Sequence, residues 1–143
     1  MISIQNLSEK EAEAGQLAAK NELTKRGKAA VIAVADAQGE LITLLRLDGA
    51  PLPSIVIAAN KAWTAARERK PTRDIGQSSR DPQSGFDMAY YGDRRYVGWG
   101  GGLPVVFDSK VVGALAVSGL PEMEDIEVAK VGVQAILSIL EKQ

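Results

Sequence analysis

The sequence predicts a single α+β domain in which helices cover an antiparallel sheet. The order of expected elements is a helix, a hairpin, a second helix, a long loop, further strands and a last helix, which is typical of α+β layer folds. The length of 143 residues suits one hydrophobic core. No repeat, linker or low-complexity tract divides the chain, so residues 1–143 are taken as one domain.

The first helix is marked at both of its ends. Ser8 and Glu11 have the spacing of a capping box, and Gly27 is a typical residue to end a helix. Between them a stripe of mostly small residues recurs at helical spacing, namely Ala12, Gly15, Ala19 and Leu23. This face predicts close packing of the helix on its neighbour.

The hairpin and the second helix follow. Residues 30–35 form a continuous apolar run, typical of a strand that is covered on both faces. A turn at 36–39 leads into a return strand at 41–47. Ser54 is suited to cap a helix that runs to about Arg69.

The second half of the chain is less regular. A polar stretch of the length of residues 77–95 is uncommon inside a compact domain and is often functional. The remaining segments are assigned as follows: a short turn from Pro71 to Gly76, strand candidates at 96–99 and 105–107 on either side of a glycine-rich bend, a central strand at 111–118, and a last helix from Pro121 to about Glu141.

The last helix is apolar on two nearly opposite sides. A helix of this kind needs two partners, and one of them can be the sheet. The other is either a second copy of the chain or the first helix of the same chain, and we expect a homo-oligomer formed through residues 122–141. The two faces are Ile126, Ala129, Val133, Leu137 and Leu140, and Val128, Val131, Ala135 and Ile139.

Composition excludes several classes of function. The chain has no cysteine and no histidine, which excludes disulfides, cysteine nucleophiles, Cys/His zinc sites, Ser-His-Asp triads and histidine-ligated haem. The 17 basic and 18 acidic residues indicate no nucleic-acid partner. No apolar run approaches the ~20 residues of a membrane span. The first six residues lack the pattern of a secretory signal, so we expect a cytoplasmic protein.

Five ordered segments resemble the GlcG/HbpS-like family, whose domain carries a haem-degrading label. The resemblance covers nearly the whole chain. The segments are residues 31–39 of the hairpin, 46–50 at the end of its second strand, 59–65 in the second helix, the run of glycines with Leu103 and Pro104, and 112–119 in the central strand.

The resemblance implies a profilin-like fold, an antiparallel sheet flanked by helices, that assembles into dimers and larger rings. It also implies a small-ligand-binding or accessory protein, whose ligand is a small organic acid or haem. An enzyme using Lys, Arg or Tyr in acid–base chemistry and a non-catalytic assembly protein remain alternatives. Whether the chain is an enzyme is left open, because the family includes members without a demonstrated reaction.

We expect a ligand pocket with the 77–95 loop as its rim. Lys61 and Thr64 share one face of the second helix and match the family signature. Glycines let backbone N–H groups converge on an anion, and a nearby arginine can neutralise a carboxylate, so the pocket is expected to prefer anions. The alternatives are a tight connection at the glycines and a surface role for the lysine. The predicted ligand-binding residues are Arg46, Asp48, Lys61, Thr64, Arg94, Gly100 and Gly101.

Two further groups of residues have alternative interpretations. Tyr90 and Tyr91 are candidates to bind haem, because tyrosine can ligate ferric haem, but they can also simply pack the loop. The four acids between Glu122 and Glu127 lie at the start of the last helix, where negative charge is favoured by the helix dipole. Their spacing matches no EF-hand, and we expect no metal site.

Overall fold

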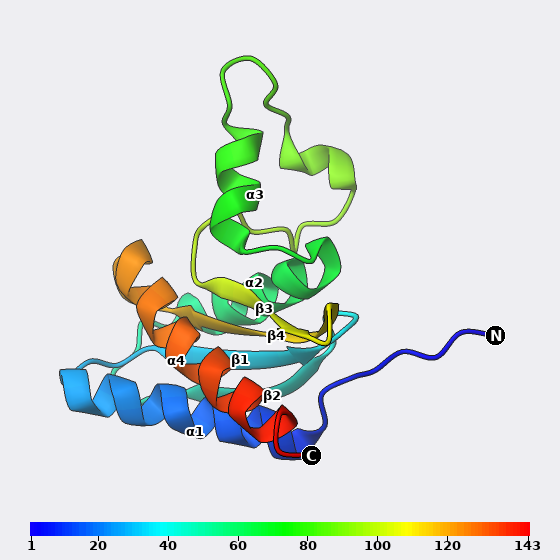
Figure 1. Cartoon of the computed structure of the whole chain (residues 1–143). Coiled ribbons are helices and arrows are strands. Elements are labelled where there is room, and N and C mark those ends of the chain that lie inside the picture. The colour runs from blue at the N-terminus through cyan, green and yellow to red at the C-terminus, as the bar shows by residue number, and fades with distance from the viewer.

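The computed structural model describes all 143 residues as three layers, shown in Figure 1. Helix α2 covers one face of a four-stranded sheet, and α1 and α4 cover the other. The elements are α1 (Glu9–Arg26), β1 (Val31–Asp36), β2 (Leu41–Arg46), α2 (Ser54–Glu68), α3 (Thr72–Ser79), the 3-10 helix η1 (Met88–Tyr91), β3 (Gly102–Phe107), β4 (Lys110–Ser118) and α4 (Glu122–Leu140). None of the helices combines the length and the apolarity that crossing a membrane requires.

The sheet is antiparallel throughout, with the strand order β2-β1-β4-β3. Successive side chains of the two central strands point to opposite faces. Ile32 and Val34 pack with α1 and α4, whereas Val31 and Ala33 pack with α2. The prediction of an α+β domain with a helix-flanked antiparallel sheet, and of 111–118 as a central strand, is confirmed.

Three local assignments were wrong. The chain after Pro71 forms the eight-residue helix α3, not a short turn, because the Pro71 carbonyl accepts from the amides of Asp74 and Ile75. Residues 96–99 form no strand, because the amide of Val97 donates to the Thr64 hydroxyl and not to a neighbouring strand. Ser54 is the first residue of α2, while Pro53 occupies the cap position.

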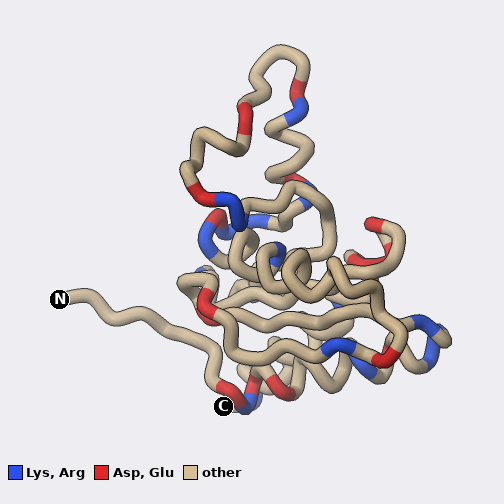
Figure 2. The backbone as a smooth tube through the Cα atoms, turned by 180° about the vertical axis from the view of Figure 1, so that it is seen from behind, with Lys and Arg blue, Asp and Glu red and all other residues tan.

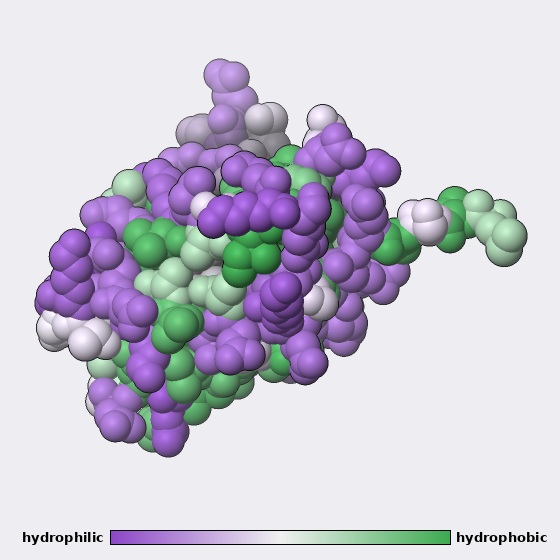
Figure 3. Space-filling view, turned by 60° about the horizontal axis from the view of Figure 1, so that its bottom comes forward, coloured by the Kyte–Doolittle hydropathy of each residue, from purple (hydrophilic) through white to green (hydrophobic).

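The buried face of α4 lies between the two predicted faces. Its buried residues are Asp125, Ile126, Val128, Ala129, Gly132 and Ile136. Gly132 lets α4 lie close to α1, since a Cβ there would come within 3.1 Å of the Gly15 carbonyl oxygen. Val131, Ala135 and Ile139 are half-buried in the layer formed by α1 and α4. Figure 3 shows this side of the molecule, where apolar residues lie among polar ones. Oligomerisation through residues 122–141 stays a prediction.

Residues 71–101 form an excursion that stands on the α2 side of the sheet (Figure 1). The excursion carries α3, the loop and η1, and it returns to the body at β3. Basic and acidic residues are both scattered along it and over the rest of the backbone, as Figure 2 shows. Its two arms cross at Gly76 and Gly98, where a Cβ on Gly76 would lie 1.9 Å from the Gly98 carbonyl oxygen. Only glycine permits this approach of one backbone to the other.

We predict that Gly76→Ala destabilises the protein by about 1–3 kcal/mol, the usual cost of overpacking, although alanine is the better helix former. The neighbouring Gln77 is exposed on the same helix, so Gln77→Ala should change the free energy of unfolding by less than about 0.5 kcal/mol. Urea denaturation of both variants measures the difference. Equal stability of the two variants would contradict the crossing as described.

Candidate functional site

A pocket of about 410 Å³ lies between α2, the end of β4, the glycine bend and the start of α4. This volume falls within the range of about 300–1,000 Å³ that is typical of small-molecule sites. The lining residues are Ser54, Ile57, Lys61, Trp99, Gly100, Ser118, Gly119, Leu120, Glu122 and Asp125. Trp99 is 61% exposed, which leaves an indole at the rim that a ligand can cover.

Lys61 is the central charged group of the pocket. It lies on α2 and is only 2% exposed. Its Nζ donates to the backbone carbonyl of Val117 at 3.0 Å and to Oδ2 of Asp125 at 3.2 Å. A Cβ on Gly101, whose φ of 126° suits glycine, would lie 2.8 Å from this nitrogen. The glycine at this position therefore gives the ammonium group the space that it occupies.

Asp125 completes the buried ion pair from the first turns of α4. Its second oxygen, Oδ1, accepts from the backbone amide of Leu120 at 3.0 Å, which fixes the turn between β4 and α4. Burial lowers the pKa of Lys61, and burial raises the pKa of Asp125, while their mutual attraction opposes both shifts. Burial thus opposes the charged form of each group, and the ion pair depends on the attraction between the two.

Two hydroxyl groups beside the pair have no partner within the chain. Ser54 and Ser118 are each 4% exposed, line the pocket and make no intrachain side-chain hydrogen bond. The one fully enclosed side-chain polar atom without a partner is Nε1 of Trp63, so both serine oxygens are accessible from the pocket. These two groups are therefore available to a molecule that enters the pocket.

The glycine bend binds the chain's own carboxylate. The amide of Gly100 donates to Oε1 of Glu122 at 2.7 Å, and Arg73 pairs with Oε2 of the same group at 3.0 Å. These contacts lower the pKa of Glu122 and keep it ionised. The pocket wall consequently carries Glu122 and Asp125 against a single lysine, so this geometry does not support the predicted preference for anions.

Two buried threonines hold the excursion to the body. The hydroxyl of Thr64 donates to the carbonyl of Arg95 at 3.0 Å and accepts from the amide of Val97 at 3.1 Å. The hydroxyl of Thr72 accepts from the amide of Gly102 at 3.0 Å. Thr64 therefore lies next to the predicted site as a residue that positions the loop, and it does not line the pocket.

The structure brings together some of the predicted site residues and separates others. Lys61, Gly100 and Gly101 meet at the pocket. Arg46 and Asp48 line a different hollow, near the C-terminal end of α1, together with Lys20, Lys28 and other residues. Arg94 is exposed and outside the pocket. Its neighbour Arg95 pairs with Asp93 and packs over the ring of Trp63.

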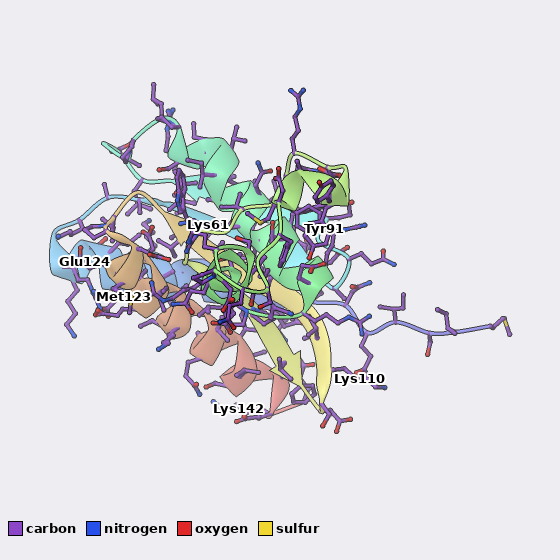
Figure 4. All side chains as sticks on the ribbon, turned by 90° about the horizontal axis from the view of Figure 1, so that it is seen from above. Lys61, Tyr91, Lys110, Met123, Glu124 and Lys142 are labelled. Carbon is purple, nitrogen blue, oxygen red and sulfur yellow. The ribbon has the colours of Figure 1, made fainter.

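Tyr90 and Tyr91 lie outside the Lys61 pocket. Tyr91 stacks on Tyr96, and its hydroxyl donates to Glu68 at 3.0 Å. Burial and the nearby carboxylate raise the pKa of Tyr91, which opposes formation of the phenolate that ligates iron. Tyr90 is 89% exposed and lines none of the larger pockets. Figure 4 shows Tyr91 well apart from Lys61, so the two predicted sites do not merge.

The acidic cluster at the start of α4 is dispersed among separate basic partners. Each carboxylate has its own contact, and no group of three acids is placed to hold a metal ion. Met123 and Glu124, at the start of the helix in Figure 4, point away from Lys61. The pairs are Glu122 with Arg73, Glu124 with Lys28, Asp125 with Lys61 and Glu127 with Arg26.

The sequence interpretation missed Asp125 as a pocket residue, although a signal for it exists. Asp125, Ala129, Gly132 and Ile136 recur at steps of four, three and four, which is the spacing of one helical face. An acid in line with small and apolar residues indicates a buried charge. Ser54 and Ser118 carry no comparable signal, because their roles depend on where two separate elements meet.

Removing either member of the ion pair should leave the other charge without compensation. We predict that Lys61→Met and Asp125→Asn each destabilise the protein by about 3–5 kcal/mol. The double variant keeps an acceptor for the Leu120 amide and leaves no unpaired charge. Its loss of stability should therefore be well below the sum of the losses in the two single variants. A double-mutant cycle by urea denaturation measures the coupling. Additive losses would show that the two groups do not interact.

Three comparisons with known proteins agree on the family. The family model described as "Haem degrading protein HbpS-like" matches residues 7–134. The chain is 33% identical to the protein GlcG of Escherichia coli over 112 residues, which are 78% of this chain and 81% of GlcG. It is 37% identical, over 62% of its length, to a 15.0 kDa protein of Citrobacter freundii from the dhaT-dhaS intergenic region. That match spans 63% of the relative's length.

Solved structures show the same fold. The protein ORFY of Klebsiella pneumoniae superposes with a TM-score of 0.90 at 29% identity, over 95% of this chain and 94% of ORFY. HbpS superposes with a TM-score of 0.81 at 26% identity, over 94% of this chain and 92% of HbpS. A PduOC–haem complex superposes at 0.84, with 24% identity, over 91% and 94% of the two chains. On the family match and the likeness to GlcG, the chain belongs to the HbpS-like family.

Proposed function

We propose that this chain is a small-ligand-binding or accessory protein, and that its ligand is a small, oxygen-rich molecule held in the Lys61 pocket. The observation that carries the proposal is a pair of pocket-lining hydroxyls, Ser54 and Ser118, that make no side-chain hydrogen bond within the chain and lie beside a buried ion pair. A lysine, two hydroxyls and the rim indole offer a ligand both hydrogen bonds and apolar contact. An assembly protein with no ligand would not need these groups.

Charge favours a neutral ligand over an organic acid. The carboxylates of Glu122 and Asp125 line the same pocket as the single ammonium group of Lys61. Asp125 already balances the charge of Lys61, and a ligand carboxylate would be repelled by the ionised Glu122. Short polyols and hydroxy-carbonyl compounds therefore fit better than the corresponding hydroxy acids.

The matched ligands glycerol, glycolaldehyde and glycolate test this preference. We predict that the neutral compounds raise the apparent melting temperature more than glycolate does, because a ligand that binds the native state stabilises it. Ser118→Ala and Trp99→Ala should weaken the effect several-fold. Arg46→Ala is the control, because Arg46 lines the separate hollow. Equal effects in all variants, or chemical-shift changes centred on Arg46, would place the binding site elsewhere.

Haem is the second candidate ligand, favoured by the family description and by the haem complex of the PduOC structure. The chain offers no histidine or cysteine, and Tyr91 is engaged by Glu68. We therefore predict that hemin binds only weakly, without a sharp Soret shift. A spectrophotometric titration that reached one haem per chain at submicromolar concentration would contradict this, and loss of that signal in Tyr90→Phe or Tyr91→Phe would identify the ligating phenol.

A further inference from the structure

We propose that Lys61 forms a reversible imine with a small aldehyde or ketone that enters the pocket. The inference rests on the proposed function, since it uses the same pocket and the same class of neutral ligand. It adds a covalent step and names the atom that forms the bond, which is Nζ of Lys61. The chain would then be a carrier or enzyme for carbonyl compounds, and more than a passive binder.

Lys61 reaches the pocket with its amine held by hydrogen bonds to two other groups of the chain. Nζ has two acceptors, the Val117 carbonyl and Oδ2 of Asp125, and Lys61 is a lining residue of the pocket. An ammonium group has three hydrogens, so the third has no acceptor among these contacts. Gly101 places no side chain beside the nitrogen.

Asp125 is placed to move the protons that imine formation requires. The carboxylate, 3.2 Å from Nζ, takes a proton from the ammonium group and leaves a neutral amine. Rotation about the Cε–Nζ bond turns the nitrogen lone pair, left facing Asp125, toward the carbonyl carbon. The C–N bond forms, the carbonyl π electrons move to oxygen, and a proton passes from the nitrogen to this oxygen to give the neutral carbinolamine. The nitrogen lone pair then expels the hydroxyl group, which takes the proton of the Asp125 carboxyl group and leaves as water. The sum is ammonium group plus carbonyl compound giving protonated imine plus water, with the Asp125 carboxylate restored and no change of oxidation state.

Electrostatics and energetics both favour this use of the pair. Burial lowers the pKa of Lys61 and raises the pKa of Asp125, so both shifts increase the share of neutral amine beside neutral acid. An apolar pair of similar volume would often stabilise a protein equally well or better. A reactive role in the pocket therefore explains this buried lysine and acid better than a role in stabilising the fold does.

The same wall supplies selectivity. The free hydroxyls of Ser54 and Ser118 can bond to a hydroxyl group next to the reacting carbonyl. Glu122 stays ionised at the wall and opposes a ligand carboxylate. A small hydroxyaldehyde such as glycolaldehyde meets these requirements, whereas glyoxylate, with a carboxylate in place of the hydroxyl-bearing carbon, does not.

Borohydride trapping tests the proposal on the full chain. The protein is incubated with glycolaldehyde and sodium cyanoborohydride at pH 7, and the modified lysines are located and timed by peptide mass spectrometry. We expect Lys61 to be converted to a stable secondary amine faster than the exposed Lys28, because burial lowers the pKa of Lys61 and so increases its neutral fraction. Glyoxylate should label Lys61 more slowly than glycolaldehyde does. Labelling of Lys61 no faster than Lys28 would overturn the proposal.

Variants separate the chemistry from binding and from folding. Lys61→Arg keeps the charge and should abolish the adduct on that peptide, and Asp125→Asn should slow its formation. Lys28→Arg removes a surface lysine that pairs with Glu124, and should leave labelling of Lys61 unchanged.

Glycerol separates binding from imine formation, because it has hydroxyl groups but no carbonyl group. If glycerol binds the wild-type protein but Lys61 is not trapped, the imine is wrong and the proposed function stands; if neither occurs, both fail. The comparison of Lys61 with Lys28 in the wild-type chain does not depend on any variant folding.

Discussion

The contact between Lys61 and Asp125 joins three elements that are far apart in the sequence. The lysine comes from α2, the carbonyl that it also binds comes from β4, and the carboxylate comes from α4. A charge on a helix that packs against a sheet needs an opposite charge inside the protein, because the cost of leaving it alone is several kcal/mol. The start of α4 must therefore lie over the end of β4, and the turn through Leu120 takes its shape from the same carboxylate.

Small residues allow the layers to approach closely enough for this contact. Alanines on β1 and on α2 bring that helix near the sheet, and Gly132 brings α4 near α1. Gly100 and Gly101 then let the returning chain pass directly over the ion pair. The pocket is thus the space that remains where the backbone is close and the side chains are short, and polar groups rather than large apolar ones line much of it.

Periodicity and end signals in the sequence were enough to predict the helices α1, α2 and α4 and the strands β1, β2 and β4 closely. They were not enough for α3, whose eight residues carry only a weak pattern, or for residues 96–99, whose backbone bonds to a threonine distant in the sequence. Lys61 and the glycines of the bend were found through their resemblance to a family. Asp125 was missed although its place on the buried face of α4 indicated a buried charge, and the two serines were missed because their roles depend on how separate elements meet. Arg46 and Asp48 lie elsewhere because β2 is at the opposite edge of the sheet from β3, which follows the glycine bend.

The attachment of the excursion has a consequence for how quickly a ligand exchanges. Trp99 and Gly100 belong to the excursion, so one wall of the pocket is carried by a segment that is bonded to the body mainly through side chains. These are the two threonine hydroxyls, the Glu122 carboxylate and the contact of Tyr91 with Glu68. Segments with few buried contacts open locally at a lower free energy than the whole domain unfolds. The residence time of a bound molecule is then governed by this local opening and not by global stability. Evolution can therefore change residence time by altering the loop, while the core that holds Lys61 and Asp125 remains as it is.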